Sequence, residues 1–535
     1  MTDAALSPAR SRAVANPWLV AAVVVVPTFM EVLDTTIAVV ALRYIVGGLS
    51  ATVDDGEWVL TSYLAANAII LPITGWLSAH LGRRNYFLAS IAIFTLSSLL
   101  CGMAGSLGQL ILFRVIQGLA GGGLQPSSQG VLLDAFPVEK QGIAMTLFGF
   151  AALIAPVVGP TLGGWITDSY SWRWVFLINV PVGLLALAGC YALLRDPDYL
   201  TTQRMELRKQ QFHFDSIGLS LLVIVMVCWE VMLSKGQEWD WLGDPFWRVQ
   251  TLAVFFSVGL VGLIFWELRH RNPVVNFRPL GERNFAGCCI IIFSAYLALY
   301  AASTSLPGLL QSLFGYDALS AGLVMSPGGV FAVLAMPIVG RLLGRGTDAR
   351  WLIAAGLLIM TAGNYWMSQL NLDISPGQVV WPRVLVVAGL AVCFAPANVA
   401  AYLYTPIALR GAAVGLLSLL RNEGGSVGTS LAQTFQERRD QFHVLRLGEY
   451  LDPFNAAANS FLGHARAFFL LQTADPVAAQ KFAWQELENL RQQQASSLAY
   501  FDSFWMMAVL TFAVAFVVLF MKRSVAERGG HVGVE

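Results

Sequence analysis

Apolar runs of about 20 residues, separated by short polar connections, occupy most of the chain. A helix needs a run of about this length to cross the ~30 Å hydrocarbon layer of a bilayer. Because backbone N–H and C=O groups inside a bilayer must be paired within the protein, each run is predicted to be a helix. The pattern predicts fourteen spans, at residues 18–42, 57–78, 86–105, 107–133, 142–166, 173–194, 216–234, 250–267, 285–311, 320–343, 351–370, 381–403, 411–434 and 501–521.

Two parts of the chain interrupt this pattern. Charged segments flank the spans at 216–234 and 250–267 and separate six preceding spans from six following ones. This layout predicts an N-terminal six-helix bundle at 1–195, linkers with two extra helices at 196–284, and a C-terminal bundle at 285–535. The stretch 435–500, rich in Gln, Ala and charge, is predicted to be an amphipathic, helix-prone loop outside the membrane.

Orientation follows from the Lys and Arg residues of the short connections, which resist translocation. Most of them lie on the side of the predicted bundle that bears both termini, so both termini are expected to be cytoplasmic. The first apolar run, from Trp18, is too long for the core of a signal peptide and has no small-residue cleavage site after it. It is predicted to remain as the first span of a multi-pass membrane protein.

Composition supports the same class. The 535 residues are 56% hydrophobic and 12% charged, about half the charge of an ordinary soluble protein, which excludes a water-exposed multidomain protein. With 33 basic and 33 acidic residues, the chain has no field that would attract nucleic acid. All six cysteines lie inside apolar runs and are interpreted as packing residues, with no metal site predicted.

Two acidic residues interrupt the first span. A carboxylate at the bilayer centre costs about 2.5 to 3.5 kcal/mol, so Asp34 is expected to serve a function, and the function predicted is proton binding. Glu31 lies one helical turn earlier on the same face and is a second candidate. The alternative is that Glu31 lies near a helix end in water and Asp34 only pairs with a cation.

Two further polar positions fall within spans. Arg114 cannot lose its proton and needs a partner or an aqueous cavity. A pairing with Asp34 that breaks on protonation would provide a switch, whereas a fixed structural ion pair is the alternative. Arg421 and Glu423 form a second polar island, for which a structural and a functional role stay equally open.

Glycine and proline gather in the fifth span, in the sequence APVVGPTLGGWI. Small residues four apart allow close helix packing, and prolines free carbonyls and permit a bend. A flexible gating helix is therefore predicted. The residues concerned are Pro156, Gly159, Pro160, Gly163 and Gly164.

A short basic turn, GWLSAHLGRRNYFL, joins the second and third spans. It is either a topology anchor or a gating element, and its candidate residues are Gly75, Gly82, Arg83 and Arg84. A similar turn, GRLLGRGTDARWL, begins at Gly340 in the equivalent place of the second half. Similar turns in corresponding halves are typical of the internal repeats of secondary transporters.

Aromatic and amide side chains at mid-span are candidates for the lining of an amphipathic substrate cavity, with ordinary core packing as the alternative for each. They are Phe29, Tyr63, Asn67, Gln125, Tyr296, Tyr300, Phe394 and Asn398. The chain has no GxxxxGK[ST] loop and no HExxH motif, so transport is expected to draw on a proton gradient, without a cofactor. An intramembrane enzyme or receptor would need a catalytic constellation or output domain that the sequence does not contain.

Several motifs occur in a characteristic order: FMEVLDTTIAVVAL, GWLSAHLGRR, FRVIQGLAGG, APVVGPTLGG, SWRWVFLINVPVG and SLLRNEGGSVGTS. Over nearly the whole chain they resemble the EmrB/QacA branch of the major facilitator superfamily. The resemblance implies an inner-membrane pump built of two six-helix bundles around a central cavity, which exports hydrophobic drugs in exchange for protons by alternating access. It also implies a periplasmic adaptor, here expected to contact residues 435–500, and through it an outer-membrane channel.

The resemblance also assigns residues. Asp34 matches the family's acidic residue in span one, Arg114 the arginine of span four, and Gly159, Pro160, Gly163 and Gly164 its antiporter motif. Two positions depart from the pattern, because Ala79 stands where many relatives have aspartate and Glu31 where similar sequences tend to have an uncharged residue. A proton-coupled importer of a nutrient or organic acid on the same fold is the alternative function, although the span-five motif argues against it.

Overall fold

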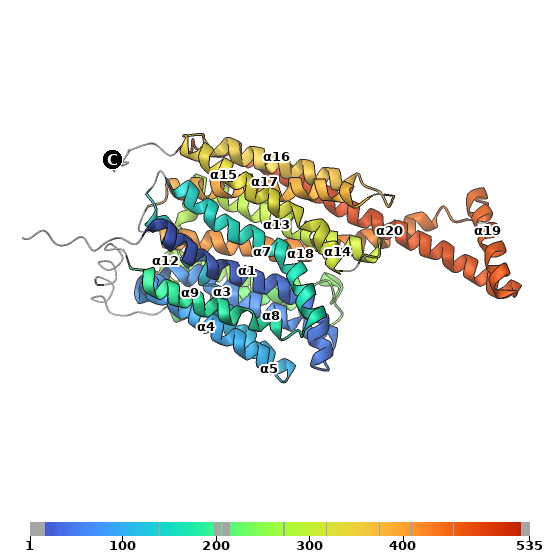
Figure 1. The fold of residues 1–535 in the computed structure, drawn as a ribbon, viewed down its shortest axis with the longest axis horizontal. Coiled ribbons are helices and arrows are strands. Elements are labelled where there is room, and N and C mark those ends of the chain that lie inside the picture. Colours follow the sequence, from blue (N-terminus) through green and yellow to red (C-terminus); the bar gives the residue numbers. More distant parts are fainter. Residues whose placement is uncertain are drawn as a thin grey trace, which may run out of the picture.

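The computed structural model describes residues 16–137, 140–196, 205, 215–270, 273–316, 318–373, 375–406, 409–452 and 454–525. Within these residues the fold is helical and contains no strand, which confirms the all-α class (Figure 1). The N-terminal half contains α1 (Pro17–Gly48), α2 (Val53–Gly56), α3 (Trp58–Leu81), α4 (Arg83–Met103), α5 (Leu107–Gly121), α6 (Leu124–Ala135), α7 (Gln141–Ser169), α8 (Trp174–Leu177) and α9 (Asn179–Leu193).

The extra pair of helices is α11 (Ser216–Lys235) and α12 (Arg248–Arg269), joined through the short 3-10 turn η2 (Trp241–Gly243). The C-terminal half follows the 3-10 turn η3 (Arg278–Gly281). It contains α13 (Arg283–Ser312), α14 (Ala318–Met325), α15 (Pro327–Gly344), α16 (Ala349–Ser368), α17 (Pro376–Leu403), α18 (Arg410–Gly448), α19 (Ala456–Thr473), α20 (Pro476–Ala515) and the 3-10 turn η5 (Phe516–Phe520).

Local sequence explains several helix ends and breaks. The side chain of Asn16 accepts a hydrogen bond from the backbone N–H of Trp18 at 3.0 Å and caps α1. Gly82, between α3 and α4, has a φ of 89°, a conformation that suits glycine. In α7 the segments Ile143–Pro156 and Thr161–Ser169 meet at an angle of 46°, so the prolines of this helix accompany a bend.

By length and composition, eleven of the described helical segments can cross a membrane, or twelve when the bent α7 is counted. Two of the fourteen predicted spans correspond to α16 and α18. These two helices are more polar and are not among the segments counted. They nevertheless lie within the bundle, where α16 packs against α17 and α18 packs against α13. A polar helix is tolerated at such depth when other helices cover it.

The extra pair does not form a separate layer. Its helices pack on each other, and α11 also contacts α3 of the N-terminal half and α18 of the C-terminal half. Only 17% of the α12 span is buried, whereas 78% of the α13 and α17 spans is buried. The pair therefore lies at the outside of the bundle, with α11 as its inner member.

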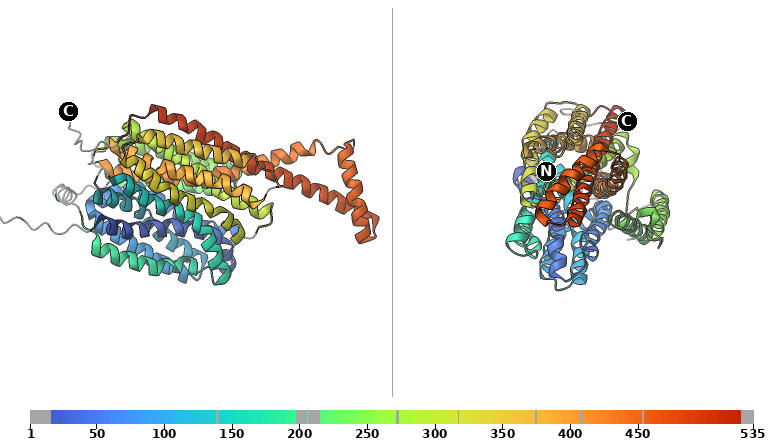
Figure 2. Two further views of the ribbon diagram at one scale, coloured as in Figure 1. Left: turned by 45° about the horizontal axis from the view of Figure 1, so that its top comes forward. Right: turned by 90° about the vertical axis from the view of Figure 1, so that its right-hand side faces the viewer.

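The predicted loop at 435–500 is built from helices that continue out of the bundle. Helix α18 runs without a break to Gly448, α19 follows, and α20 begins at Pro476 and returns to form the last span. Figures 1 and 2 show this extension projecting from the end opposite to the one where α1 begins and η5 ends. Below, the two ends of the bundle are called the extension end and the termini end.

Candidate functional site

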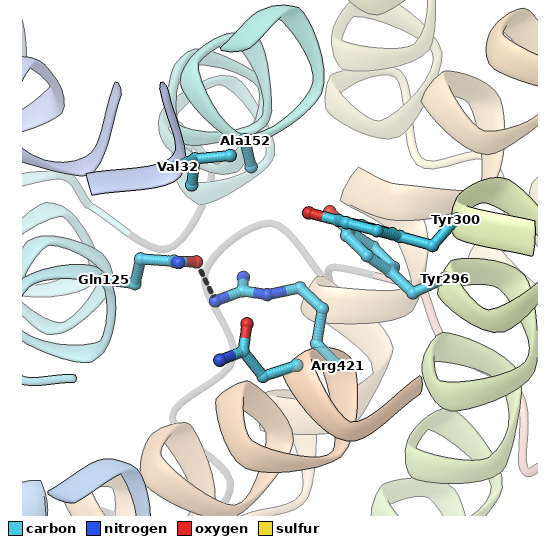
Figure 3. Close-up of a pocket in the computed structure, with 7 residues that line it drawn as sticks. Val32, Gln125, Ala152, Tyr296, Tyr300 and Arg421 are labelled. Atoms are coloured by element: carbon cyan, nitrogen blue, oxygen red, sulfur yellow. Dashed lines mark hydrogen bonds between the residues drawn. The ribbon is translucent and has the colours of Figure 1, made fainter. Parts of the chain in front are cut away.

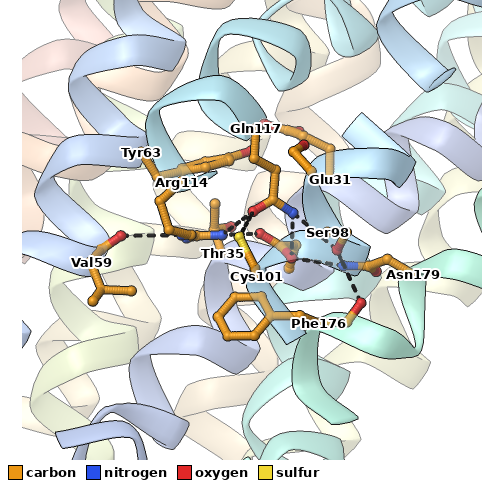
Figure 4. Close-up of polar contacts among 12 residues, drawn as sticks. Glu31, Thr35, Val59, Tyr63, Ser98, Cys101, Arg114, Gln117, Phe176 and Asn179 are labelled. Atoms are coloured by element: carbon orange, nitrogen blue, oxygen red, sulfur yellow. Dashed lines mark hydrogen bonds and ion pairs between the residues drawn. The ribbon is translucent and has the colours of Figure 1, made fainter. Parts of the chain in front are cut away.

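Asp34 lies inside the N-terminal half, on the face of α1 that is turned toward α5. Its Oδ2 accepts a hydrogen bond from Nη1 of Arg114 at 2.5 Å, and neither side chain is exposed. Two amides complete the shell, because Gln117 and Asn179 donate to Oδ1 at 3.1 and 2.7 Å (Figure 4). Burying two charges costs several kcal/mol each unless they are paired and hydrogen-bonded, and this arrangement provides both.

Ser98 of α4 ties the two amides together. Its hydroxyl accepts hydrogen bonds from Gln117 at 3.2 Å and from Asn179 at 3.0 Å, and it donates to the carbonyl of Phe176 at 3.0 Å. The Asp34 site is thus held by residues of α1, α4, α5, α8 and α9. A change of charge at Asp34 would therefore alter hydrogen bonds that involve all of these helices.

Arg114 has further partners besides Asp34. Its Nε donates to the carbonyl of Val59 at 3.1 Å, its Nη1 to Gln117 at 2.9 Å, and its guanidinium lies 4.2 Å from the ring centroid of Tyr63. Its Nη2 has no hydrogen-bond partner among the described residues. The arginine is therefore anchored on α3 and α5 even when Asp34 is protonated, with one donor left to bind another acceptor.

Glu31 is also buried, and it faces a different set of residues. Its Oε1 accepts hydrogen bonds from Tyr63 at 3.3 Å and Asn67 at 3.1 Å, and its Oε2 accepts one from Gln125. Only 3% of Glu31 is exposed, which excludes a position in water near a helix end. Asp34 and Glu31 are accordingly two separate sites on one helix.

A polar bridge joins the two halves next to Glu31. Nη2 of Arg421, on α18, donates to Oε1 of Gln125, the same amide that binds Glu31. The neighbouring Asn422 donates to Asn67 at 2.9 Å. Glu31 is thereby connected to the C-terminal half through neutral amides, so its charge state can bear on how the halves fit together.

A small cavity lies at this bridge (Figure 3). It is lined by Val32, Gln125, Ala152, Tyr296, Tyr300, Arg421 and Asn422. The space open to the centre of a water molecule is about 10 Å³, room for about one water. Drug-sized ligands occupy cavities of roughly 300 to 1,000 Å³, so the two halves must separate before a substrate can bind here.

The halves also touch near both ends of the bundle. At the termini end, a Cβ added to Gly75 of α3 would come within 2.7 Å of the backbone of Gly411 on α18. Toward the extension end, a Cβ added to Gly322 of α14 would lie 2.5 Å from the side chain of Thr161 on α7. Glycine at both contacts lets helices of opposite halves meet, and this conformation is closed on both sides.

The glycines of the fifth-span motif bring α7 onto α1 beside Asp34. A Cβ at Gly159 would lie 2.0 Å from Oγ1 of Thr36, and one at Gly163 would lie 3.2 Å from Ile37. Pro156 ends the first segment of the bent helix, Pro160 lies in its break, and Gly164 is buried. Any larger residue at Gly159 would push α7 away from the helix that carries the buried acid.

The basic turn between α3 and α4 is fixed by acidic and backbone partners. Arg83 forms an ion pair with Asp134 and donates to the carbonyl of Gly130 at 3.1 Å. Arg84 donates through its backbone N–H to Asp196 at 2.7 Å and through its side chain to the carbonyl of Tyr191 at 3.0 Å. The turn of the second half, before α16, likewise contains a glycine of positive φ, Gly346.

The predicted cavity residues divide between four places. Gln125, Tyr296 and Tyr300 line the cavity, while Tyr63 and Asn67 bind Glu31. Phe394 stacks on Phe148 at 6.1 Å between ring centroids, and Asn398 accepts a hydrogen bond from Gln129 at 2.6 Å. Phe29 is half-buried and packs in an apolar cluster of the N-terminal half.

Within the second polar island, Arg421 and Glu423 do not form a pair. Arg421 faces the cavity, whereas Glu423 accepts a hydrogen bond from the indole of Trp229 at 2.6 Å and lies against α11. Three functional candidates were not predicted: Gln117, Asn179 and Glu230. Glu230 is an acidic residue within an apolar span, as Asp34 is. The same sequence signal could therefore have identified it.

The family of the chain follows from comparison with known proteins. The model of the Major Facilitator Superfamily matches residues 24–429, well over half of the chain. The chain belongs to the major facilitator superfamily. This membership establishes a transporter and a multi-pass membrane protein, and it agrees with the resemblance found in the sequence.

Within the superfamily, the chain is similar to multidrug export proteins. It is 35% identical over 511 residues to "Multidrug export protein EmrB" of Escherichia coli K12, covering 95% of both chains. It is 38% identical over 449 residues to the Haemophilus influenzae protein of the same name, covering 83% of this chain and 86% of the relative. These matches confirm the EmrB-type relationship.

Solved structures show the same fold. A double tryptophan mutant of XylE matches with a TM-score of 0.59, 14% identity, and coverage of 96% of this chain and 97% of the other. The human organic anion transporter MFSD10 matches with a TM-score of 0.57 and 14% identity, over 94% and 99% of the two chains. At this identity the likeness establishes a major facilitator fold.

Proposed function

We propose that this chain exports hydrophobic, structurally varied drugs across the inner membrane in exchange for protons. Export of drugs is supported by the names of the relatives, which match nearly end to end. The route is supported by the closed cavity between the halves, lined by two tyrosines and the cationic Arg421. Alternating access opens this cavity first to one side and then to the other, and needs no bound cofactor.

One observation carries the proton coupling: Asp34 is fully buried and neutralised by Arg114. A proton arriving at Asp34 removes its charge and weakens the ion pair, and the anchored guanidinium then has another free donor. Helix α7 packs on α1 through Gly159 and Gly163, and it also contacts the C-terminal half. Loosening of the Asp34 site on α1 can therefore move α7 relative to the C-terminal half. Loss of the proton on the opposite side restores the pair.

The energy is sufficient for export. One proton crossing a driving force of ~150 mV supplies about 3.5 kcal/mol. Because about 1.4 kcal/mol corresponds to a factor of ten, this sustains a gradient of a neutral drug of roughly a few hundred-fold. A single coupling carboxylate therefore suffices for efflux.

The first experiment substitutes Asp34→Asn in protein reconstituted into liposomes. Drug-driven proton movement should be lost while drug binding persists, because Asn keeps the shape and hydrogen bonding of the site but cannot carry the charge. The exposed Asp55, bonded to Thr52, provides the matched control Asp55→Asn. Unchanged antiport in the Asp34 variant would exclude the coupling role and leave a structural ion pair.

Direction is tested with everted vesicles. Labelled drug should accumulate inside them when a proton gradient is imposed, as expected for an exporter. Accumulation in right-side-out vesicles instead would favour the importer.

We further propose that both termini face the cytoplasm. The native cysteines are all buried, so introduced cysteines can report on sidedness. Gly463→Cys would place a cysteine at an exposed position of α19 in the extension. Arg345→Cys would place one at an exposed position of the termini end. An impermeant thiol reagent applied to intact spheroplasts should label the first and not the second, whereas the reverse pattern would invert the topology.

The extension is proposed to contact a periplasmic adaptor of a tripartite pump. It projects beyond the bundle and exposes large apolar side chains, among them Phe454 at 92% and Leu471 at 89%. Exposed apolar groups of this kind mark interaction surfaces. Replacing residues 445–490 by a short flexible linker should preserve antiport in liposomes but abolish drug resistance of intact cells; preserved resistance would refute the contact.

A further inference from the structure

Two buried carboxyl groups meet where the extra helices join the C-terminal half. Glu230 belongs to α11 and is 2% exposed, and Glu423 belongs to α18 and is 6% exposed. Helix α11 is fastened to α18 around them, because Ser430 donates to the carbonyl of Leu233 at 2.8 Å. The carboxyls are therefore enclosed by protein and do not face lipid.

Each carboxyl has one conventional donor and one oxygen without any. Trp229 donates to Oε2 of Glu423 at 2.6 Å, and Ser426 donates to Oε1 of Glu230 at 3.2 Å. The remaining oxygens, Oε2 of Glu230 and Oε1 of Glu423, are buried and have no donor among the described residues. Because Trp229 of α11 binds the acid of α18 and Ser426 of α18 binds the acid of α11, the two carboxyls lie beside each other where the helices pack. Two carboxyl groups can share a hydrogen bond only if one of them carries a proton.

In the part of the chain that the structure describes, neither carboxyl has a cation as its partner. None of the ion pairs among the described residues includes Glu230 or Glu423. The charged and titratable groups of the neighbouring helices bind other partners. Arg421 binds Gln125, and Lys235 binds Glu57 and Glu238. Glu267 binds the backbone of Val275, Asp502 binds Arg439 and His443, and Tyr296 and Tyr300 line the cavity. Two like charges enclosed together without a cation cannot both ionise, so the pair must share a proton.

We propose that Glu230 and Glu423 form a second proton-carrying site, which holds one proton in the closed conformation and takes up and gives back another during transport. The step is a protonation alone: an acid and a carboxylate bind one proton to become two acids, and no other bond forms or breaks. The proposal rests on the proposed exchange of drug for protons. It adds a site on the extra helices, outside the N-terminal half that holds Asp34.

The position of the pair explains how its charge would affect transport. Helix α18 carries Glu423 two residues after Arg421, which bridges to Gln125, and one residue after Asn422, which bridges to Asn67. Helix α11 also packs on α3 of the N-terminal half. A shift of α18 away from α3 that opens the cavity would therefore also strain the contact between Glu423 and α11. Glu230 lies five residues, or ~7.5 Å along the helix, from Lys235, whose partners Glu57 and Glu238 are partly exposed at the extension end. A proton can thus approach from that side.

The first test detects the shared proton by spectroscopy and does not depend on a transport measurement. Infrared difference spectra of the full-length protein at neutral pH should contain the carbonyl band of a protonated carboxylic acid in this pair. The band should be lost in both Glu230→Gln and Glu423→Gln, and kept in the matched control Glu437→Gln, an exposed position on the same helix. A band unchanged in both pair variants would overturn the proposal.

The second test measures coupling in liposomes. With a pH gradient of one unit, each coupled proton multiplies the limiting drug gradient about tenfold, so losing one should lower it about tenfold. Glu230→Gln and Glu423→Gln should each show this drop and still exchange drug for protons, because Asp34 still drives the movement of the halves. Asp34→Asn stops that movement and with it the transfer of both protons. An unchanged limiting gradient, even with the infrared band lost, would make the pair structural. Absence of drug-driven proton movement in the unsubstituted protein would instead refute the proposed function itself.

Discussion

Two of the buried acid sites of this transporter, Asp34 and the pair Glu230 and Glu423, compensate for burial of a carboxyl group in opposite ways. Asp34 has its own cation, Arg114 at 2.5 Å, and two amide donors, so its negative charge is fully compensated. Among the described residues, Glu230 and Glu423 have only a serine and an indole as donors and form no ion pair. The first site is an ion pair that a proton must break, and the second is an acid pair that must already hold a proton.

This difference implies different responses to substitution. Removing the cation from an ion pair leaves a buried, unpaired charge, which is among the costliest changes in a protein interior. Removing the charge from one member of an acid pair leaves an amide that can still donate to its neighbour. The stability of variants therefore distinguishes the two kinds of site independently of any transport measurement.

The largest effect is expected for Arg114→Gln. It leaves Asp34 buried without its cation and should lower the free energy of unfolding by about 3 to 5 kcal/mol, measured by denaturant titration in detergent. The double variant with Asp34→Asn removes the orphaned charge and should recover most of the loss. Equal stability of the single and double variants would show that Asp34 is already protonated in the closed state.

A smaller loss is expected for Trp229→Phe. The substitution removes the hydrogen bond to Glu423, worth about 1.5 to 3 kcal/mol if the acceptor is charged, and keeps the stacking of this ring on Phe256. The exposed Trp351 gives the matched control Trp351→Phe, which should change little. If both substitutions cost the same, the indole does not stabilise a charge on the acid pair.

Glu423→Gln should cost still less, about 1 kcal/mol or under. The amide NH₂ can take the place of the shared proton and donate to Glu230, so the hydrogen bond between the helices survives. The free energy of unfolding, measured as for Arg114→Gln, should therefore fall several-fold less than it does there. A loss as large as that of Arg114→Gln would mean that Glu423 is an ion paired with an unrecognised cation.

The smallest effect concerns a pair outside the membrane-spanning segments. Burial tends to raise the pKa of Asp348, but hydrogen bonds from Arg350 and from the backbone of Ser524 hold that pKa below its ordinary value. A lowered pKa in the folded state contributes stability above the ordinary aspartate pKa of ~3.9, and the contribution is lost as the pH falls below it. Asp348→Asn should remove about 1 kcal/mol or less at pH 7 and nothing at strongly acid pH, as thermal unfolding at the two pH values would reveal.

Sequence alone determined the membrane class, the helical fold and the family, and it identified Asp34 as a candidate site. Each follows from a rule that acts locally: apolar length sets a span, and an isolated charge in a span is too costly to be accidental. The same rule applies to Glu230, in the run VCWEVML. This rule identifies each such residue separately, because it considers only the cost of burying one charge.

The packing of the helices, and no local sequence pattern, determines which buried charges share a site. Arg421 and Glu423 are two residues apart, yet one points to the cavity between the halves and the other to α11, since successive residues on a helix face different neighbours. Glu230 and Glu423 are separated by most of the C-terminal half in sequence and are brought together by the packing of α11 on α18. Whether a buried acid holds a proton or a cation depends on such partners, and these are set by the packing of helices distant in sequence.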